Sequence, residues 1–166
     1  MGKQSLKFRT DVAMSGKLGY DIRVNELTPD ELEFSKAAVQ NYNRLKDLIW
    51  NGDLYRIISP YEEQRSVIMY VSQDKTKSVI FSYALHPRSM NRFNPVRLSG
   101  LDPAKLYQIT EINKMKAANR PGGGGPRNFG PSEGKSYSGD YLMKIGYSMP
   151  NNSELTSAVL EINEAK

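Results

Sequence analysis

The chain changes character near residue 52, and this change limits the possible folds more than any other feature. Residues 1–52 contain one strand-like segment and one long amphipathic helix, whereas residues 53–166 consist of short β-segments separated by turns. A single strand ahead of a helix belongs to a βα series, in which parallel strands need neighbours, and no second unit of this kind follows. We therefore interpret residues 1–52 as a remnant and residues 53–166 as a C-terminal antiparallel β-sandwich domain, which makes the chain mainly β.

Residues 28–52 have the strongest local signals for a helix. Thr28 is a good N-cap, Pro29 suits the first helical position, and Glu31 completes a capping box. Gly52 is a natural helix stop. One apolar stripe runs along the segment at helical spacing and consists of Phe34, Ala38, Tyr42, Leu45 and Ile49. We expect Trp50, Phe34 and Tyr42 to pack where this helix meets the sheet.

The residues before this helix predict two further elements. Tyr20, Ile22 and Val24 alternate with polar residues, which is the period of a strand. Residues 8–15 suit the last turns of a preceding helix.

The second part of the chain has several strand signals. Runs rich in Ile, Val, Tyr and Met are bounded by turn residues and lie at residues 54–59, 66–72, 78–84, 96–98, 107–112 and 157–164. Residues 139–146 fit either a strand or a helical turn. Glycine and proline dominate residues 117–136, which predicts a mobile loop.

The composition excludes several kinds of chemistry. The chain has no cysteine and a single histidine, His86, which argues against disulfides, histidine-based metal sites and a Ser-His-Asp triad. We expect no metal and no cofactor. The longest apolar runs are too short to cross a membrane, so we expect no membrane partner. The composition does not indicate a cellular compartment.

Positive charge is concentrated between His86 and Arg127, where eight lysine and arginine side chains face two acidic ones. Such a patch suits an anion, nucleic acid or a solvated face, and we favour the solvated face. Arg120, Arg127 and Phe129 resemble the mixture of cations and aromatic rings in segments that bind single strands, but the tract is short, and we expect no nucleic-acid partner. Gly122–Gly125 is followed by Pro126 instead of a Gly-Lys-Ser/Thr sequence, which favours a flexible loop over a phosphate-binding loop.

Four acidic residues and His86 are the candidate site residues. Asp21 and Glu26 flank the C-terminal end of the expected strand, where barrel enzymes place their chemistry, but one strand cannot supply a pair of catalytic carboxylates. Glu62 and Glu63 suit a solvated turn. His86 precedes a proline at a strand exit, which favours a surface position over a general base. We therefore predict no catalytic, cofactor-binding or metal-binding residue on this chain.

Tyrosine is abundant in the second part of the chain. Exposed aromatic rings can stack on sugars, but tyrosine is also a common strand residue, and Tyr70 and Tyr83 lie in expected strands. An independent carbohydrate-binding module is therefore the alternative function. The candidate rings are Tyr55, Tyr61, Tyr70, Tyr83, Tyr107, Tyr137, Tyr141 and Tyr147.

An ordered series of motifs resembles the C-terminal part of α-galactosidases of glycoside hydrolase family 36. Arg9, Thr10, Val12 and Ala13 are followed by Gly16, Gly19, Tyr20 and Asp21 and then by the long helix. Later matches are Gly52–Arg56, Ser59-Pro60, Gly100–Pro103, Tyr107, Glu111–Asn113, Ser138–Lys144 and Ser157–Glu161. The similarity covers nearly the whole chain. It departs at the glycine-rich loop 119–131, which has the character of an insertion.

The resemblance implies that residues 1–52 are the last strand and helix of a truncated (β/α)8 barrel. It also implies a parent that is a retaining hydrolase, which removes terminal α-linked galactose with two aspartates on earlier strands. The family's Lys-Trp-Asp motif and its cysteine-containing stretch are absent from this chain. We therefore expect an α-galactoside substrate in the parent, no hydrolysis by this chain alone, a structural role beside the barrel, and possible homo-oligomers through the exposed remnant.

Overall fold

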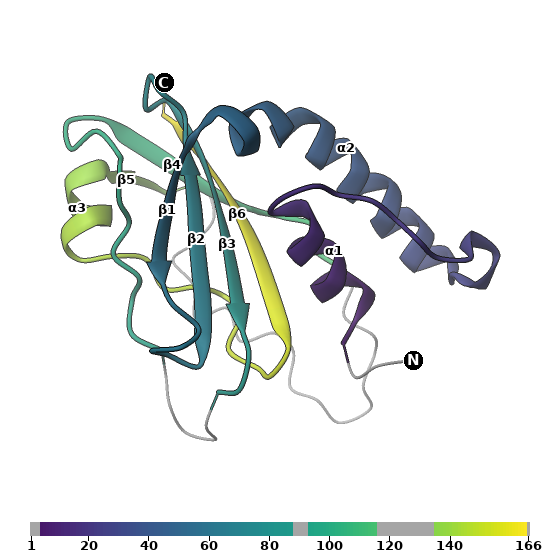
Figure 1. Cartoon of the computed structure of the whole chain (residues 1–166). Coiled ribbons are helices and arrows are strands. Elements are labelled where there is room, and N and C mark those ends of the chain that lie inside the picture. Colours follow the sequence, from purple (N-terminus) through teal and green to yellow (C-terminus); the bar gives the residue numbers. More distant parts are fainter. Residues whose placement is uncertain (1–3, 88–92, 116–134, 166) are drawn as a thin grey trace.

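A six-stranded antiparallel sheet forms the centre of the molecule (Figure 1). The computed structural model describes residues 4–87, 93–115 and 135–165. The strand order is β1-β2-β3-β6-β4-β5. The strands are β1 (Asp53–Ile58), β2 (Arg65–Val71), β3 (Lys77–Ala84), β4 (Leu106–Ile112), β5 (Ser136–Ser138) and β6 (Thr156–Glu164).

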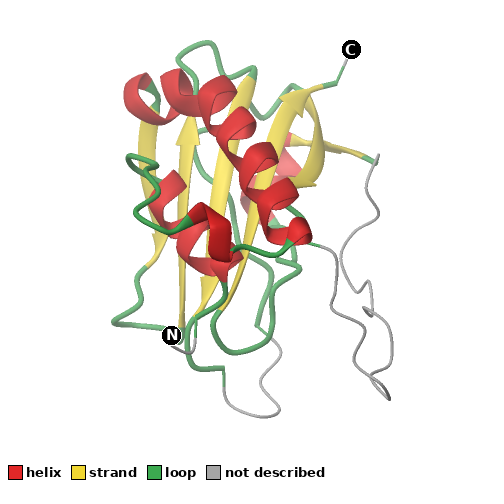
Figure 2. Cartoon of the chain, turned by 90° about the vertical axis from the view of Figure 1, so that its right-hand side faces the viewer, coloured by secondary structure: helices red, strands yellow, loops and turns green. Residues whose placement is uncertain are grey.

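Each face of the sheet is covered by a different set of elements. The helices α1 (Leu6–Met14) and α2 (Pro29–Asn51) lie across one face, as Figure 2 shows. They share a core with β3 and β6 in which Tyr42 and Leu45 meet Phe81 and Val159. On the opposite face, α3 (Gly139–Lys144) and irregular segments pack on alternate residues of β2 and β6. The central strand β3 is therefore buried on both sides.

The predicted mainly β, antiparallel fold is confirmed. A sandwich would have a second sheet. Here all six described strands lie in one sheet, and helices and irregular segments cover its two faces instead. One isolated antiparallel bridge, between Val96 and Tyr147, lies outside the named strands. The predicted strand at residues 96–98 is thus limited to this bridge, and residues 139–146 adopt the helical alternative as α3. No sequence pattern predicted the short strand β5.

Helix α2 is confirmed with its capping box and its buried stripe. The Thr28 hydroxyl accepts from the Glu31 amide, and the Glu31 carboxylate accepts from the Thr28 amide. The expected packing at the junction is only partly correct. Tyr42 joins the core shared with the sheet, but Phe34 belongs to a small separate cluster near the start of α2, and Trp50 is 61% exposed.

The predicted strand at residues 20–24 is wrong. This segment has no ladder partner, and Val24–Glu26 forms a 3₁₀ turn. The physical reason is that a strand needs a neighbour to satisfy its backbone groups, and within the described residues the sheet lies elsewhere. The helix expected at residues 8–15 is confirmed as α1. The predicted mobile loop falls almost entirely on residues 116–134, outside the described residues.

Candidate functional site

Asp11, on the last turn of α1, is a fully buried carboxylate at the contact between the N-terminal helices and the sheet. Its Oδ2 atom accepts from the Lys7 ammonium at 2.6 Å and from the Ser157 hydroxyl at 2.7 Å. Its Oδ1 atom accepts from the Asn113 amide at 3.1 Å. A buried charge is tolerated only when it is paired and hydrogen-bonded, and these three donors meet that requirement. We call Asp11, Lys7, Asn113 and Ser157 the Asp11 cluster.

The local structure explains how each donor reaches Asp11. Lys7 lies one helical turn before it on α1, at the i,i+4 spacing. Ser157 is the second residue of β6, in the middle of the sheet. Asn113 follows β4 with a φ of 55°, a left-handed conformation that asparagine tolerates better than most residues. Its side chain also accepts from Asn41 of α2, so the cluster joins both helices to two strands.

Three tyrosine hydroxyls hold the end of α1 from outside the helix. Tyr83 of β3 donates to the Asp11 carbonyl oxygen at 3.0 Å, and Tyr70 of β2 donates to the Ser15 carbonyl oxygen at 2.7 Å. Tyr42 of α2 donates to the Gly16 carbonyl oxygen at 3.0 Å. The Asp11 carbonyl also accepts from the Ser15 amide within the helix. The three hydroxyls therefore tie the last turn of α1, and the residues just beyond it, to the sheet and to α2.

Burial has an electrostatic consequence for these tyrosines. It raises the pKa of the Tyr83 hydroxyl well above its ordinary value of 10.0, and it raises the pKa of Tyr70 in the same direction. Both phenols therefore stay protonated and able to donate at neutral pH.

The Asp11 cluster connects α1 and α2 to β6 and to the residue that follows β4. Both Asp11 oxygens accept hydrogen bonds, and the Ser157 hydroxyl donates one of these bonds to a carboxylate that is 0% exposed. Within the described ranges, no three His, Cys, Asp or Glu side chains are grouped to hold a metal ion. Nor is any helix of the described chain both long and apolar enough to cross a membrane.

The acidic residues weighed from the sequence do not converge on one site. Asp21 and Glu26 are exposed in the segment between α1 and α2, where Glu26 pairs with Arg23 at 3.2 Å. Glu63 pairs with the buried Arg65 at 2.8 Å, while Glu62 is exposed in the turn before β2. The solvated turn expected for Glu62 and Glu63 agrees with the exposure of both side chains.

His86 lies at the surface, as expected. Its Nδ1 atom is 3.1 Å from a Glu154 carboxylate oxygen, and the two side chains are 75% and 64% exposed. A general base would need a cleft, and this pair stands in open solvent. Gly122–Gly125, Arg120, Arg127 and Phe129 lie outside the described residues.

The structure divides the tyrosines into different roles. Tyr83, Tyr107 and Tyr147 are buried, while Tyr55, Tyr70 and Tyr137 are partly buried. Only Tyr61, at 98% exposure, and Tyr141, at 44%, are exposed among the eight candidates, all of which lie in described segments. The high tyrosine content of this part of the chain therefore reflects mainly core packing and the docking of helix α1.

Sequence reasoning missed the Asp11 cluster. Asp11 lies between Thr10 and Val12 of the first quoted motif, while Asn113 and Ser157 lie at the ends of two others. The only sequence signal for the cluster was the charge of Asp11 in a helical segment of mixed polarity, and such a charge normally indicates a solvated helix face.

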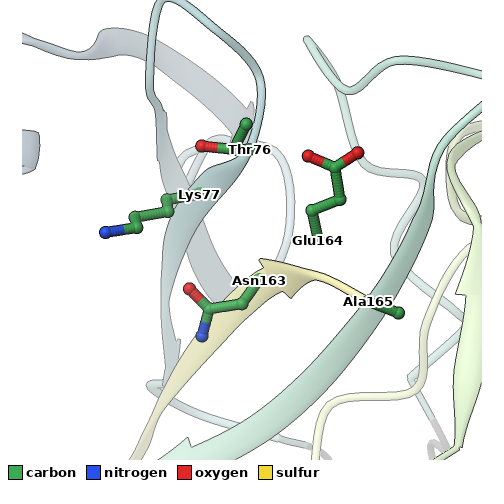
Figure 3. A pocket seen from close by; sticks show the side chains of 5 residues that line it. All are labelled: Thr76, Lys77, Asn163, Glu164 and Ala165. Carbon is green, nitrogen blue, oxygen red and sulfur yellow. The ribbon is translucent and has the colours of Figure 1, made fainter.

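A shallow hollow lies at the far end of the sheet, between the start of β3 and the end of β6. Its volume is about 440 Å³, and its lining consists of Thr76, Lys77, Asn163, Glu164 and Ala165. Figure 3 shows that Lys77 and Glu164 extend in different directions. Glu164 is already paired with Lys105 at 3.1 Å, so the hollow has no convergent set of polar groups.

Comparison with known proteins gives one consistent result. The family model described as the glycosyl hydrolase family 36 C-terminal domain matches residues 65–162. The chain is 29% identical over 149 residues to alpha-galactosidase AgaA of Geobacillus stearothermophilus, which covers 90% of this chain and 17% of that protein. It therefore spans less than a fifth of the length of this relative.

Solved structures agree with the sequence comparison. The crystal structure of alpha-galactosidase AgaB from Geobacillus stearothermophilus aligns with a TM-score of 0.80 at 27% identity, over 99% of this chain and 20% of that one. A variant of AgaA from the same organism, in complex with stachyose, aligns with a TM-score of 0.79 at 27% identity, over the same shares of the two chains.

Proposed function

Because this chain belongs to glycosyl hydrolase family 36 through the C-terminal domain of that family, we propose that it serves as the C-terminal, non-catalytic part of an α-galactosidase. In this proposal the whole enzyme is a retaining hydrolase that removes terminal α-linked galactose from oligosaccharides. Residues 1–52 are the end of its catalytic barrel, and residues 53–166 form the C-terminal domain that supports it.

The observation that carries the proposal is the Asp11 cluster. It fastens α1 to strands β4 and β6 through a carboxylate that is 0% exposed. Tyr70 and Tyr83 of the sheet add hydrogen bonds to the same helix. A terminal domain that holds the last helices of a barrel in place needs a junction of this kind.

The acidic side chains support a non-catalytic role. A retaining glycosidase needs two carboxyl groups about 5–5.5 Å apart on either side of the scissile bond. Among the described residues Asp11 is the only buried acidic side chain, and both of its oxygens accept hydrogen bonds from neighbouring residues. The proposed substrate site therefore belongs to other parts of the enzyme, which would bind an α-galactoside.

The exposed side of the N-terminal helices supports a further partner. Val12 is 46% exposed and Trp50 is 61% exposed, and the Trp50 indole donates to the Gly16 carbonyl oxygen just beyond α1. These apolar groups would face the barrel in the whole enzyme. In this chain alone they are the proposed contact for homo-oligomers.

The experiment has two arms. The purified 166-residue chain is first incubated with p-nitrophenyl α-D-galactopyranoside, with AgaA as the positive control. We expect no release of nitrophenol by the chain, and measurable turnover would refute the non-catalytic role.

In the second arm the matching C-terminal region of AgaA is replaced by this chain. We expect the chimera to hydrolyse the same substrate, and we expect Asp11→Ala to shorten the half-life of its activity on heating. A matched Glu26→Ala change at the exposed Arg23 pair should leave the half-life unchanged. A chimera that folds but does not need Asp11 would contradict the supporting role.

A further inference from the structure

Tyr141 lies on α3, on the opposite side of the sheet from the helices that would face the barrel (Figure 1). It is 44% exposed, and its ring stacks on Tyr137 with the centroids 5.7 Å apart and the planes inclined by 24°. Tyr61, by contrast, is 98% exposed in a turn, with no described aromatic ring beside it. The two exposed tyrosines thus differ in how firmly their rings are held.

The stack under Tyr141 is anchored in the core. Tyr137 meets Tyr147 edge to face, with centroids 6.0 Å apart, and Tyr147 is 6% exposed. The Ser138 hydroxyl accepts from the Tyr141 amide and fixes the start of α3. Leu142 is fully buried beside them. Because these contacts fix the orientation of the Tyr141 ring, little entropy is lost when a ligand packs against it.

Two charged groups accompany the ring on the same short helix. Asp140 accepts from Lys144 at 2.7 Å, and the side chains are 48% and 72% exposed. Because each side chain keeps about half or more of its surface in solvent, both can reach a ligand that binds along α3. A pyranose has this combination of surfaces, since its C–H face packs on an aromatic ring while its hydroxyls bond to carboxylate and ammonium groups.

We propose that Tyr141, Asp140 and Lys144 form a surface site for a pyranose ring. The choice of a galactosyl unit of an oligosaccharide as its occupant rests on the proposed function, whereas the site itself rests on the geometry of α3. In the whole enzyme such a site would hold an oligosaccharide on the side of the C-terminal domain away from α1 and α2. The site would bind the sugar and would not cleave it.

The test is an NMR titration of the ¹⁵N-labelled 166-residue chain with stachyose. We expect amide shift changes that concentrate on residues 138–145 and saturate with weak affinity. Tyr141→Ala should weaken binding by about tenfold, which corresponds to about 1.4 kcal/mol. Tyr141→Phe should retain binding because the ring face is preserved.

Tyr61→Ala is the matched control, and it should bind stachyose as the unaltered chain does. Equal weakening in both alanine variants, or no shift changes at residues 138–145, would overturn the proposal. If Tyr141→Ala loses its dispersed spectrum, Asp140→Asn is used instead, and unchanged affinity in that variant counts against the site. These results do not depend on hydrolysis, so they fail or succeed separately from the role proposed for the whole chain.

Discussion

Replacing Asp11 with alanine removes the acceptor that three donors share at the contact between α1 and the sheet. Ser157 and Asn113 are each 5% exposed, so neither can turn to water when the carboxylate is lost. The Lys7 side chain is 17% exposed and can move partly into solvent. The substitution should therefore loosen the N-terminal helices and lower the free energy of unfolding.

The magnitude follows from these environments. A buried donor left without an acceptor costs about 1–3 kcal/mol, and the Ser157 hydroxyl falls in this range. Asn113 keeps its contacts with Asn41 and Met14, so the free energy lost at Asn113 lies at the lower end of this range. Adding a discounted loss for the Lys7 charge gives about 3–5 kcal/mol, the range expected when one partner of a buried pair is removed. For a chain of this size the melting temperature should fall by on the order of 10 °C.

The assay is urea unfolding followed by far-UV circular dichroism and by Trp50 fluorescence. Trp50 is the only tryptophan, and its indole contacts the Gly16 carbonyl oxygen, so its fluorescence reports on the α1 end. The matched control is Glu26→Ala, which removes a carboxylate paired with Arg23 at the surface and should change stability by less than about 0.5 kcal/mol. A loss below about 1 kcal/mol for Asp11→Ala would refute the reasoning, as would additive effects of Asp11→Ala and Ser157→Ala in a double-mutant cycle.

Three further predictions concern other parts of the fold. Burial raises the pKa of Tyr83 in the folded state, so its contribution to stability is complete below the ordinary pKa of 10.0 and is lost as pH rises through the raised value. Tyr83→Phe should therefore lower the free energy of unfolding at neutral pH by about 1 kcal/mol. The same substitution should flatten the alkaline limb of a pH–stability curve. Hydrogen bonds from Ser72 and Thr76 lower the pKa of Asp74 from 3.8 to about 2, so Ser72→Ala should raise this pKa toward 3.8 in an NMR titration, and an unchanged pKa would contradict the assigned cause. A methyl group at Gly139 would collide with a backbone carbonyl oxygen whereas one at Gly19 meets nothing within 4 Å, so thermal unfolding should show a loss for Gly139→Ala of at least about 1 kcal/mol and almost none for Gly19→Ala, and equal losses would refute the close approach.

Local signals carried those parts of the fold that the sequence predicted correctly. The capping box at Thr28 and the stripe from Phe34 to Ile49 define α2 because each signal involves residues within one or two turns. The strands β2 and β3 follow in the same way from the runs at residues 66–72 and 78–84, and they pair as antiparallel neighbours. The ordered motifs also indicated the family whose C-terminal domain model matches residues 65–162.

The error at residues 20–24 has a different origin. The alternation of Tyr20, Ile22 and Val24 is a genuine strand pattern, but a pattern of side chains supplies no partner for the backbone. Tyr20 and Ile22 instead pack beside Phe34 and Ala38 at the start of α2. The strand propensity of residues 20–24 therefore did not produce a strand, because the described sheet offers this segment no neighbouring strand.

The sequence by itself determined the family, the β-rich character of the chain and the limits of its longest helix. Only the tertiary structure decided that Asp11 is buried, that Tyr70 and Tyr83 hold a helix instead of a sugar, and that Tyr141 is the exposed ring with a stacked support. The reason is distance along the chain. Asp11 meets Asn113 and Ser157 across separations of 102 and 146 residues, and no local period encodes a contact of that range.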